Sequence, residues 1–401
     1  VKRKKSVKKV MMRMIAICVV LLLVVNGDSA PMYDGKIRQA EDGTWFAFMK
    51  PPYASNHAST IEVFPDGSLG LAWFSGKGEG LNRCSIVFAT LPNGTDTWTD
   101  AITVSVHDGY SDQNPVLYYD SHSSLLRLYH SQQPANDGEK NSRILELNST
   151  DLGKTWTTPD IFKGGDFPGA FPRNRIIEAD DGGLLFPIYN ANDQHSIIER
   201  SNIPRKHWDH IDIQGTHDMV RIFLRTYEYT HSNITKTQIQ VQPTMIRLKD
   251  GSLRVWFRDR NEEHIYVATS HDDARTFSKP VPSGLPNPNV GIEANVLIRS
   301  DHCAQNSSNT AVVLVFNDYN KSNVTKYGRT PLNIALSYDG GVSWPFIKTL
   351  QATNDGEKAG PHVEFSYPSV LQTDDGYIHV SYTYDRETIK YRRVTEEWIR
   401  S

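Results

Sequence analysis

The sequence predicts an all-β protein, and more narrowly a six-bladed β-propeller. Two observations lead to this prediction: a short phrase that recurs six times along the chain, and a second phrase that alternates with it. The composition agrees, because 27 Gly, 21 Pro, 15 Phe and 18 Tyr in 401 residues are typical of many short strands joined by turns. Signals for helices are poor throughout.

The first phrase is a polar residue, then a small residue or Pro, an apolar run, and a turn about eight residues after the start. It is clearest in QPTMIRLKDG, from Gln242, and in YPSVLQTDDG, from Tyr367. Both copies end in Asp-Gly, a strong signal for a hairpin turn. Each copy therefore predicts the first strand of a small sheet. The six leading residues are His57, Asn114, Arg173, Gln242, Glu293 and Tyr367.

The second phrase is S-x-D-x-G-x-x-W, an Asp box. STDLGKTW (149–156) and SYDGGVSW (337–344) fit it fully, and SHDDARTF (270–277) fits with Ala for Gly and Phe for Trp. SNIPRKHW, from Ser201, and TLPNGTDTW, from Thr90, are degenerate copies. Ser and Asp side chains of this kind bond back to a tight turn. The aromatic residue is expected to be buried between neighbouring sheets.

Six units across residues 31–401 give about 60 residues each, enough for a four-stranded sheet. Sheets repeated radially form a propeller, in which each blade buries its faces on its neighbours. No linker or low-complexity segment interrupts the chain after residue 30. The sequence therefore predicts one propeller domain over residues 31–401.

Residues 1–30 have the composition of a secretory signal. A basic segment precedes the 12-residue apolar stretch Met14–Val25, and small residues follow at Ser29 and Ala30. Twelve apolar residues are short for a bilayer span, and an uncleaved type II membrane anchor is the alternative. The sequence thus predicts entry into the secretory pathway, with a secreted or lysosomal destination.

Asparagine sequons and cysteines agree with this route. Six Asn-x-Ser/Thr sequons follow the signal segment, at Asn93, Asn148, Asn233, Asn306, Asn320 and Asn323. Beyond residue 30 the cysteines are Cys84 and Cys303, which could pair. Two distant cysteines do not make a disulfide framework, so the fold must depend on its core.

The charge balance excludes some partners. Residues 31–401 hold 36 Lys and Arg against 45 Asp and Glu, a formal net charge of −9. This argues against nucleic acid or an anionic membrane surface as a partner. No CxxC, HExxH, P-loop or GxGxxG motif is present, so the sequence predicts no metal site, no nucleotide site and no cofactor.

The leading residues predict a functional site. The first strand of each propeller blade lines the central channel, so the six leaders are expected to converge on one mouth. A structural rim would not need His, Arg, Glu and Tyr at equivalent positions. Convergent ionisable groups at a concave mouth are typical of a binding or catalytic site.

These repeats resemble those of the sialidase (neuraminidase) superfamily, specifically its bacterial-neuraminidase-repeat, or Asp-box, branch. They cover nearly all of residues 50–395, and the match is best in GRTPLNIALSYDGGVSW and FSYPSVLQTDDGYIHVSYTY. The resemblance implies an exo-acting glycoside hydrolase for sialylated or other acidic glycans. It also implies a retaining mechanism with a Tyr nucleophile assisted by Glu, an Asp acid and three Arg that bind the sugar carboxylate.

Several residues correspond to this pattern. Tyr367 falls where the family has its nucleophilic Tyr, and Arg258 (in VWFRDR) and Arg329 (in GRTPL) fall near two of the three Arg. The resemblance thus implies that these two arginines bind a carboxylate. Arg173 is a further candidate for the same role, and Gln242 and Asn114 are candidates for substrate contacts.

Three positions depart from the pattern. His57 stands where the first Arg is expected, Gln242 where the Glu partner is expected, and Asn82 with Arg83 where the Asp acid would lie. His does not replace a bidentate guanidinium, and Gln cannot act as a base. Glu293 is then the candidate base for Tyr367, and Glu79 or His57 the candidate acid for the leaving oxygen.

The departures leave two alternatives to a sialidase-like hydrolase. With His57 and Tyr367 as a base and acid pair, the site would suit a uronate-directed hydrolase or lyase. If the departures abolish catalysis, the chain would be a glycan-binding propeller. All three interpretations predict a glycan as the partner.

Overall fold

The computed structural model describes residues 32–162, 166–202, 207–216, 239–300, 309–320, 329–353 and 363–401. The predicted signal segment, Cys303 and three sequons (Asn233, Asn306 and Asn323) lie outside these residues. In the described ranges, no helix has the length and apolar character needed to cross a membrane.

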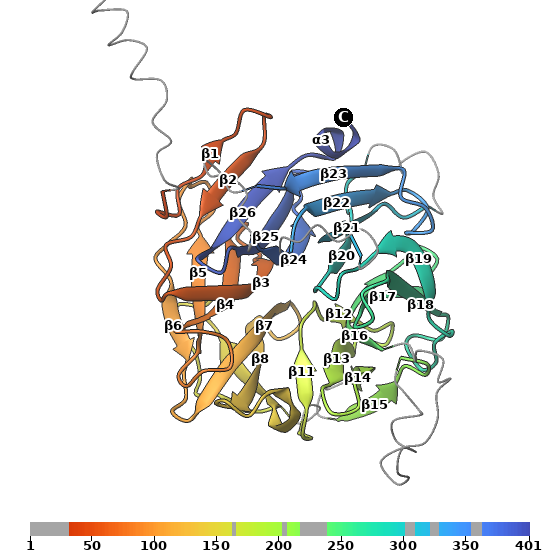
Figure 1. Cartoon of the computed structure of the whole chain (residues 1–401), viewed down its shortest axis with the longest axis horizontal. Coiled ribbons are helices and arrows are strands. Elements are labelled where there is room, and N and C mark those ends of the chain that lie inside the picture. Colours follow the sequence, from red (N-terminus) through yellow and green to blue (C-terminus); the bar gives the residue numbers. More distant parts are fainter. Residues whose placement is uncertain are drawn as a thin grey trace, which may run out of the picture.

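The predicted fold class is confirmed: six antiparallel sheets form a ring, a six-bladed β-propeller (Figure 1). Blade 1 consists of β3 (Ser55–Val63), β4 (Leu69–Gly76), β5 (Ser85–Leu91) and β6 (Ile102–Ser105). Blade 2 consists of β7 (Tyr110–Asp120), β8 (Leu125–Pro134), β9 (Arg143–Ser149) and β10 (Asp160–Ile161), with the short 3-10 helix η1 (Glu139–Asn141) before β9. Blade 3 consists of β11 (Ala170–Pro172), β12 (Ile177–Glu178), β13 (Leu184–Asn190), β14 (His195–Ser201) and β15 (Trp208–Asp212).

The second half of the chain forms the other three blades. Blade 4 consists of β16 (Gln240–Arg247), β17 (Leu253–Asp259), β18 (His264–Ser270) and β19 (Val281–Pro286). Blade 5 consists of β20 (Glu293–Val296), β21 (Val312–Asn317), β22 (Leu332–Ser337) and β23 (Phe346–Gln351). Blade 6 consists of β24 (Phe365–Gln372), β25 (Ile378–Tyr384), β26 (Thr388–Val394), β2 (Trp45–Phe48) and β1 (Arg38–Gln39).

Blade 6 closes the ring because it combines both ends of the described chain. β2 pairs antiparallel with β26, so that Phe46 faces Arg392 and Phe48 faces Lys390. The helix α3 (Glu396–Arg400) follows β26, and the Thr395 side chain accepts the Trp398 amide at its N-terminus.

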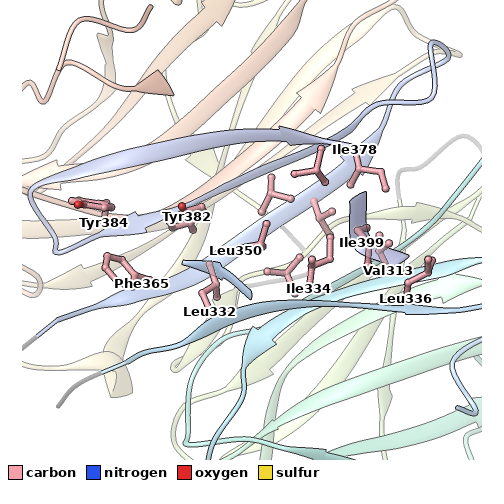
Figure 2. Packing of buried hydrophobic residues seen from close by; sticks show 14 of the residues in the cluster. Val313, Leu332, Ile334, Leu336, Leu350, Phe365, Ile378, Tyr382, Tyr384 and Ile399 are labelled. Carbon is pink, nitrogen blue, oxygen red and sulfur yellow. The ribbon is translucent and has the colours of Figure 1, made fainter. Parts of the chain in front are cut away.

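The core lies between neighbouring blades. Figure 2 shows one such layer, in which Leu332, Ile334 and Leu336 of β22 pack with Phe365 and Tyr382 of blade 6. All five side chains are fully buried. Burying a side chain of this size contributes about 1.5–3 kcal/mol, so the blades stabilise one another as the sequence repeat predicts.

The predicted Asp-box turns are confirmed in three blades. In blade 2 the Ser149 hydroxyl donates to Asp151 and accepts the Gly153 amide, and Asp151 accepts the Thr155 amide. The boxes that begin at Ser270 and Ser337 make the same bonds. Each box joins the third and fourth strands of its blade, so it holds the outermost hairpin.

The first strands of four blades contain the same β-bulge. Where the register shifts, one residue has a positive φ: Ala58 (56°), Asn114 (47°), Gln242 (52°) and Tyr367 (51°). The predicted register is thus confirmed for Asn114, Gln242 and Tyr367. It was wrong by one residue in blade 1, where Ala58 is the equivalent and His57 precedes it. Arg173 and Glu293, both in described segments, are not among the residues with positive φ.

Candidate functional site

The candidate site lies at the face of the propeller where the first strands begin. In antiparallel blades the second strand ends, and the third begins, at this same face. Tyr367 is near the start of β24, Arg258 near the end of β17, and Arg329 just before β22. Arg386 lies in the hairpin between β25 and β26. The topology therefore brings these four side chains together at one face of the ring.

Tyr367 is at the centre of this group. Its hydroxyl accepts a hydrogen bond from Arg258 Nη1 at 2.6 Å and a longer one from Gln242 Nε2 at 3.4 Å. The guanidinium carbons of Arg173, Arg258 and Arg329 lie 5.2, 5.8 and 5.4 Å from the centre of its ring. The Tyr367 side chain is buried, so these charges act on it with little screening by water.

This arrangement changes the acidity of the phenol. Burial raises the pKa of Tyr367, but the positive charges of Arg258 and Arg329 lower it more, so its pKa lies below the usual value for tyrosine. The hydroxyl oxygen already accepts a charge-assisted bond from Arg258. The arginines therefore favour ionisation of this phenol relative to an ordinary tyrosine.

Neighbouring amides hold Arg258 in place. Its Nε donates to Asn289 Oδ1 at 2.7 Å, and its Nη1 is shared between the Tyr367 hydroxyl and Gln242 Oε1 at 3.0 Å. Arg258 is 4% exposed. Gln242 therefore bonds to both the arginine and the phenol, as a neutral partner at the position where the resemblance implies a carboxylate.

A more exposed group of charges lies beside the tyrosine. Glu364 accepts bonds from Arg329 Nη1 at 2.9 Å and from Arg386 Nε at 2.8 Å, and Arg386 Nη1 donates to Glu79 at 2.6 Å. Burial raises the pKa of Glu364, but the charges around it, the two arginines included, lower it far below its usual value. The side chains of Arg329 and Arg386 are 27% and 30% exposed, so ligands can reach both.

His57 packs against Tyr367, with ring centres 4.4 Å apart. Its Nδ1 bonds to the Thr383 hydroxyl at 2.8 Å and lies 3.6 Å from Glu364. Burial lowers the pKa of His57 well below its usual value, and this outweighs the opposite effect of Glu364. The imidazole is thus neutral near pH 7, which makes it a poor candidate for an acid.

Three other predicted residues connect blades near the site. Arg173 donates to the Ser59 and Pro368 carbonyls at 3.3 and 2.7 Å. Glu293 is 2% exposed and accepts the Val370 amide at 2.8 Å rather than the Tyr367 hydroxyl. Asn114 donates to the Pro172 carbonyl at 3.2 Å. Arg173 thus supports Tyr367 from a buried position, while Glu293 and Asn114 bond to backbone groups of neighbouring blades.

Comparison with known proteins assigns the family. Residues 67–380, more than half of the chain, match the BNR repeat-like domain family. The chain belongs to this family. A sialidase of Bacteroides fragilis (strain YCH46) is 25% identical over 224 residues, which are 54% of this BNR repeat-like chain and 36% of the relative. The match therefore spans about a third of the relative's length.

Solved structures share the fold. The intramolecular trans-sialidase from Ruminococcus gnavus superposes on the BNR repeat-like chain with a TM-score of 0.68 at 14% identity, over 93% of this chain and 100% of the other. The Hadza microbial sialidase Hz136 gives 0.67 at 15% identity, over 86% of this chain and 67% of the other. The predicted resemblance to the sialidase superfamily is confirmed.

Two charged residues of this BNR repeat-like site were not predicted. Glu364 lies three residues before Tyr367, outside the repeated phrase, and Arg386 lies in the hairpin YDRE. Asp385 and Arg386 both have positive φ, so the hairpin turns tightly and directs Arg386 toward Glu364 and Glu79. The only sequence signal was Asp-Arg between two alternating strands.

Asn82 and Arg83 occupy the loop where the resemblance implies an acid. Asn82 bonds to Asp108 and to the Gly109 amide, so it joins the loops of blades 1 and 2. The Arg83 amide donates to the Tyr110 carbonyl. Glu79, in the same loop, bonds to Arg386 and is the carboxylate that this loop contributes to the group of charges beside Tyr367.

Proposed function

We propose that this chain is an exo-acting, sialidase-like glycoside hydrolase that cleaves sialylated or other acidic glycans with retention, with Tyr367 as the nucleophile. The observation that supports this proposal is the hydrogen bond that the Tyr367 hydroxyl accepts from Arg258 at 2.6 Å. Arg173 and Arg329 lie beside the same ring. The sialidase relatives support the substrate class.

In the proposed first step, the Tyr367 oxygen forms a bond to the anomeric carbon while the bond to the leaving oxygen breaks and that oxygen is protonated. Water then cleaves the glycosyl–tyrosine bond, and the second inversion restores the configuration. Phenol with an ordinary pKa near 10 is a weak nucleophile at neutral pH. Arg258 and Arg329 lower the pKa of Tyr367 below its usual value, which favours loss of the phenol proton to water before the attack.

The leaving oxygen needs an acid, and Glu79 is our choice. It is 40% exposed and bonds to Arg386, so it lies at the open side of the site. His57 is neutral and buried, which argues against it as the acid. A substrate that displaces Arg386 from Glu79 would leave this carboxylate free to take up a proton from solvent and then donate it to the leaving oxygen.

The arginines divide into two kinds by exposure. Arg173 and Arg258 are 2% and 4% exposed and serve the tyrosine. Arg329 and Arg386 are accessible, and together they present guanidinium groups that can bind a sugar carboxylate. On this proposal Arg386 supplies the positive charge that His57 does not.

Release of free N-acetylneuraminic acid from a fluorogenic sialoside tests the proposal. We expect turnover by the parent and none by Tyr367→Phe, with unchanged folding by circular dichroism. Tyr377→Phe is the matched control, because Tyr377 lies at the other end of the same blade, between Trp45 and Arg393. Full activity in Tyr367→Phe would disprove the proposed nucleophile.

A second function is favoured by Gln242. A neutral amide next to the Tyr367 hydroxyl is compatible with a propeller that binds an acidic glycan without cleaving it. Calorimetry with 3′-sialyllactose separates the two functions. Binding that is lost in Arg329→Ala, with no turnover of the sialoside by the parent, would support glycan binding instead of hydrolysis.

A further inference from the structure

Two histidines and an aspartate meet on the outer strands of blade 3. His195 Nε2 lies 2.9 Å from Asp212 Oδ1, and His210 Nε2 lies 3.3 Å from the same oxygen. The three potential ligand atoms lie within 4.8 Å of one another. β15 is the outermost strand of its sheet, whereas Tyr367 is on the innermost strand of blade 6. This His-His-Asp cluster is therefore separate from the site at the centre of the ring.

The pairing of β14 with β15 builds the cluster. Glu199 faces His210 and Ile197 faces Asp212 across the strands. Side chains alternate between the two faces of a sheet with a period of two, so residues 195, 197 and 199 share a face with residues 210 and 212. His195 is the diagonal neighbour of Asp212, within reach of a long side chain. The register between β14 and β15 thus places the three potential ligand groups side by side on one face of the sheet.

A buried carboxylate orients His210. Glu199 is 2% exposed, and its Oε1 lies 2.6 Å from His210 Nδ1. The Phe167 ring packs edge-on against the imidazole, with centres 5.3 Å apart. Histidines that bind metal commonly use the second ring nitrogen to donate to a carboxylate, which fixes the tautomer and the ring orientation.

Two carboxylates flank the His210 ring. Its two ring nitrogens face two carboxylates, Glu199 at Nδ1 and Asp212 at Nε2. A neutral imidazole carries one N–H, so it can donate to one carboxylate and would present a lone pair to the other. A metal ion beside Nε2 would bond to that lone pair, and the Nε2 of a second imidazole, His195, lies 2.9 Å from the same Asp212 oxygen.

We propose that the His-His-Asp cluster is a binding site for a divalent transition metal of the zinc class. His195 Nε2, His210 Nε2 and a carboxylate oxygen of Asp212 would be the ligands, and solvent would complete the coordination. Imidazole and carboxylate are ordinary zinc ligands, and a set of three protein ligands leaves one position open. Asp212 is 54% exposed and His210 41%, so a metal can reach the cluster from solvent.

Zinc titration of the chelator-treated full chain tests the proposal by calorimetry and by thermal unfolding, without any need for enzyme activity. The parent is expected to bind one Zn²⁺ per chain with submicromolar affinity, and the metal is expected to raise its Tm. Asp212→Asn and His195→Ala are each expected to weaken binding by at least about 10–100-fold, since the first replaces a carboxylate ligand by a neutral amide and the second removes an imidazole. Co²⁺ in place of Zn²⁺ should give visible absorption typical of tetrahedral or five-coordinate sites.

His207→Ala with Asp209→Asn is the matched control. These residues form another His–Asp pair, 3.1 Å apart, and both are well exposed on the same segment. The control is expected to bind Zn²⁺ like the parent. Absence of zinc binding by the parent would overturn the proposal. Weak binding that Asp212→Asn and His195→Ala do not change would overturn it as well, since the metal would then be held elsewhere.

Discussion

Two sets of positions recur around this ring, the Asp-box turns and the bulges of the first strands, and they differ in an instructive way. The boxes repeat their residues: Ser149, Ser270 and Ser337 make the same bonds to their own turns. The bulges repeat their geometry but not their side chains, which are Ala58, Asn114, Gln242 and Tyr367.

The difference follows from where each set of positions faces. Every box holds the outer hairpin of its own blade, so each box has the same structural role and the same residue types. The bulges face a shared space, and a positive φ at each of them redirects one side chain. A non-Gly residue with positive φ costs about 1–2 kcal/mol, and four blades accept that cost. Their varied side chains therefore indicate a site, whereas the constant residues of the boxes indicate structure.

The largest expected effect is a loss of turnover on substitution of Arg258, and Arg254 of the same strand β17 is its control. Arg258 bonds to Tyr367, whereas Arg254 Nη1 donates to the Gly340 carbonyl in the Asp box of blade 5 at 2.8 Å. We expect Arg258→Met to lower sialoside turnover about 100–1000-fold, because a charge next to the nucleophile is lost. Arg254→Met should cost about 1 kcal/mol of unfolding free energy and leave turnover unchanged.

The same pair of variants has a readout that needs no substrate. Removing Arg258 removes a charge that lowers the pKa of Tyr367, so its ionisation should move to higher pH in an ultraviolet titration. Arg254→Met should leave that titration unchanged. Equal effects of the two substitutions on turnover would contradict the assignment of the bulge positions to the site and of the Asp boxes to structure.

A glycine in a box gives the next effect. Gly341 has a φ of +85°, and an added Cβ would lie 2.4 Å from Trp256 Cζ2. Gly341→Ala should therefore lower the free energy of unfolding by more than about 2 kcal/mol, from backbone strain and overpacking. The equivalent position of the box at 270–277 is Ala274, with a φ of 65°. Ala274→Gly should change stability by less than about 0.5 kcal/mol, and urea unfolding measures both.

His57 gives a smaller, pH-dependent effect. Because its pKa in the folded chain is well below the value near 6.5 of the unfolded chain, acid gives the unfolded state a proton that the folded state does not bind. Stability should be complete above pH 6.5 and decrease below it, by at most about 1.4 kcal/mol per pH unit from this group. His57→Gln should flatten the slope of unfolding free energy against pH below 6.5. An unchanged slope would show that His57 is protonated in the folded chain.

The fold could be predicted because its signals are local. Each hairpin turn and each Asp box is complete within about ten residues, and the alternation between them sets the strand order within a blade. Gln242 and Tyr367 could be predicted as neighbours for the same reason, since both lead repeats, whereas Arg258 was expected only from the resemblance to the sialidase superfamily.

Other parts of the sites depend on contacts that no local pattern encodes. In blade 1 the phrase starting at His57 has one residue more than its equivalents, and only the bulge shows that Ala58 is the match. Glu364 and Arg386 meet because a hairpin turn and a strand start lie at one face, although 22 positions separate them. The His-His-Asp cluster likewise depends on the register between β14 and β15, so no short metal-binding motif marks it.

The pairing of β2 with β26 has a consequence for how the protein is made. During synthesis β2 leaves the ribosome early, but its partner exists only after residues 388–394 have been added. Until then β1 covers one edge of β2 and the other edge is unpaired, and such edges readily pair with other chains. Blades 1 to 5 can form beforehand, since their strands pair in chain order, but the ring itself cannot close. The second edge of β2 is therefore covered only when blade 6 is complete.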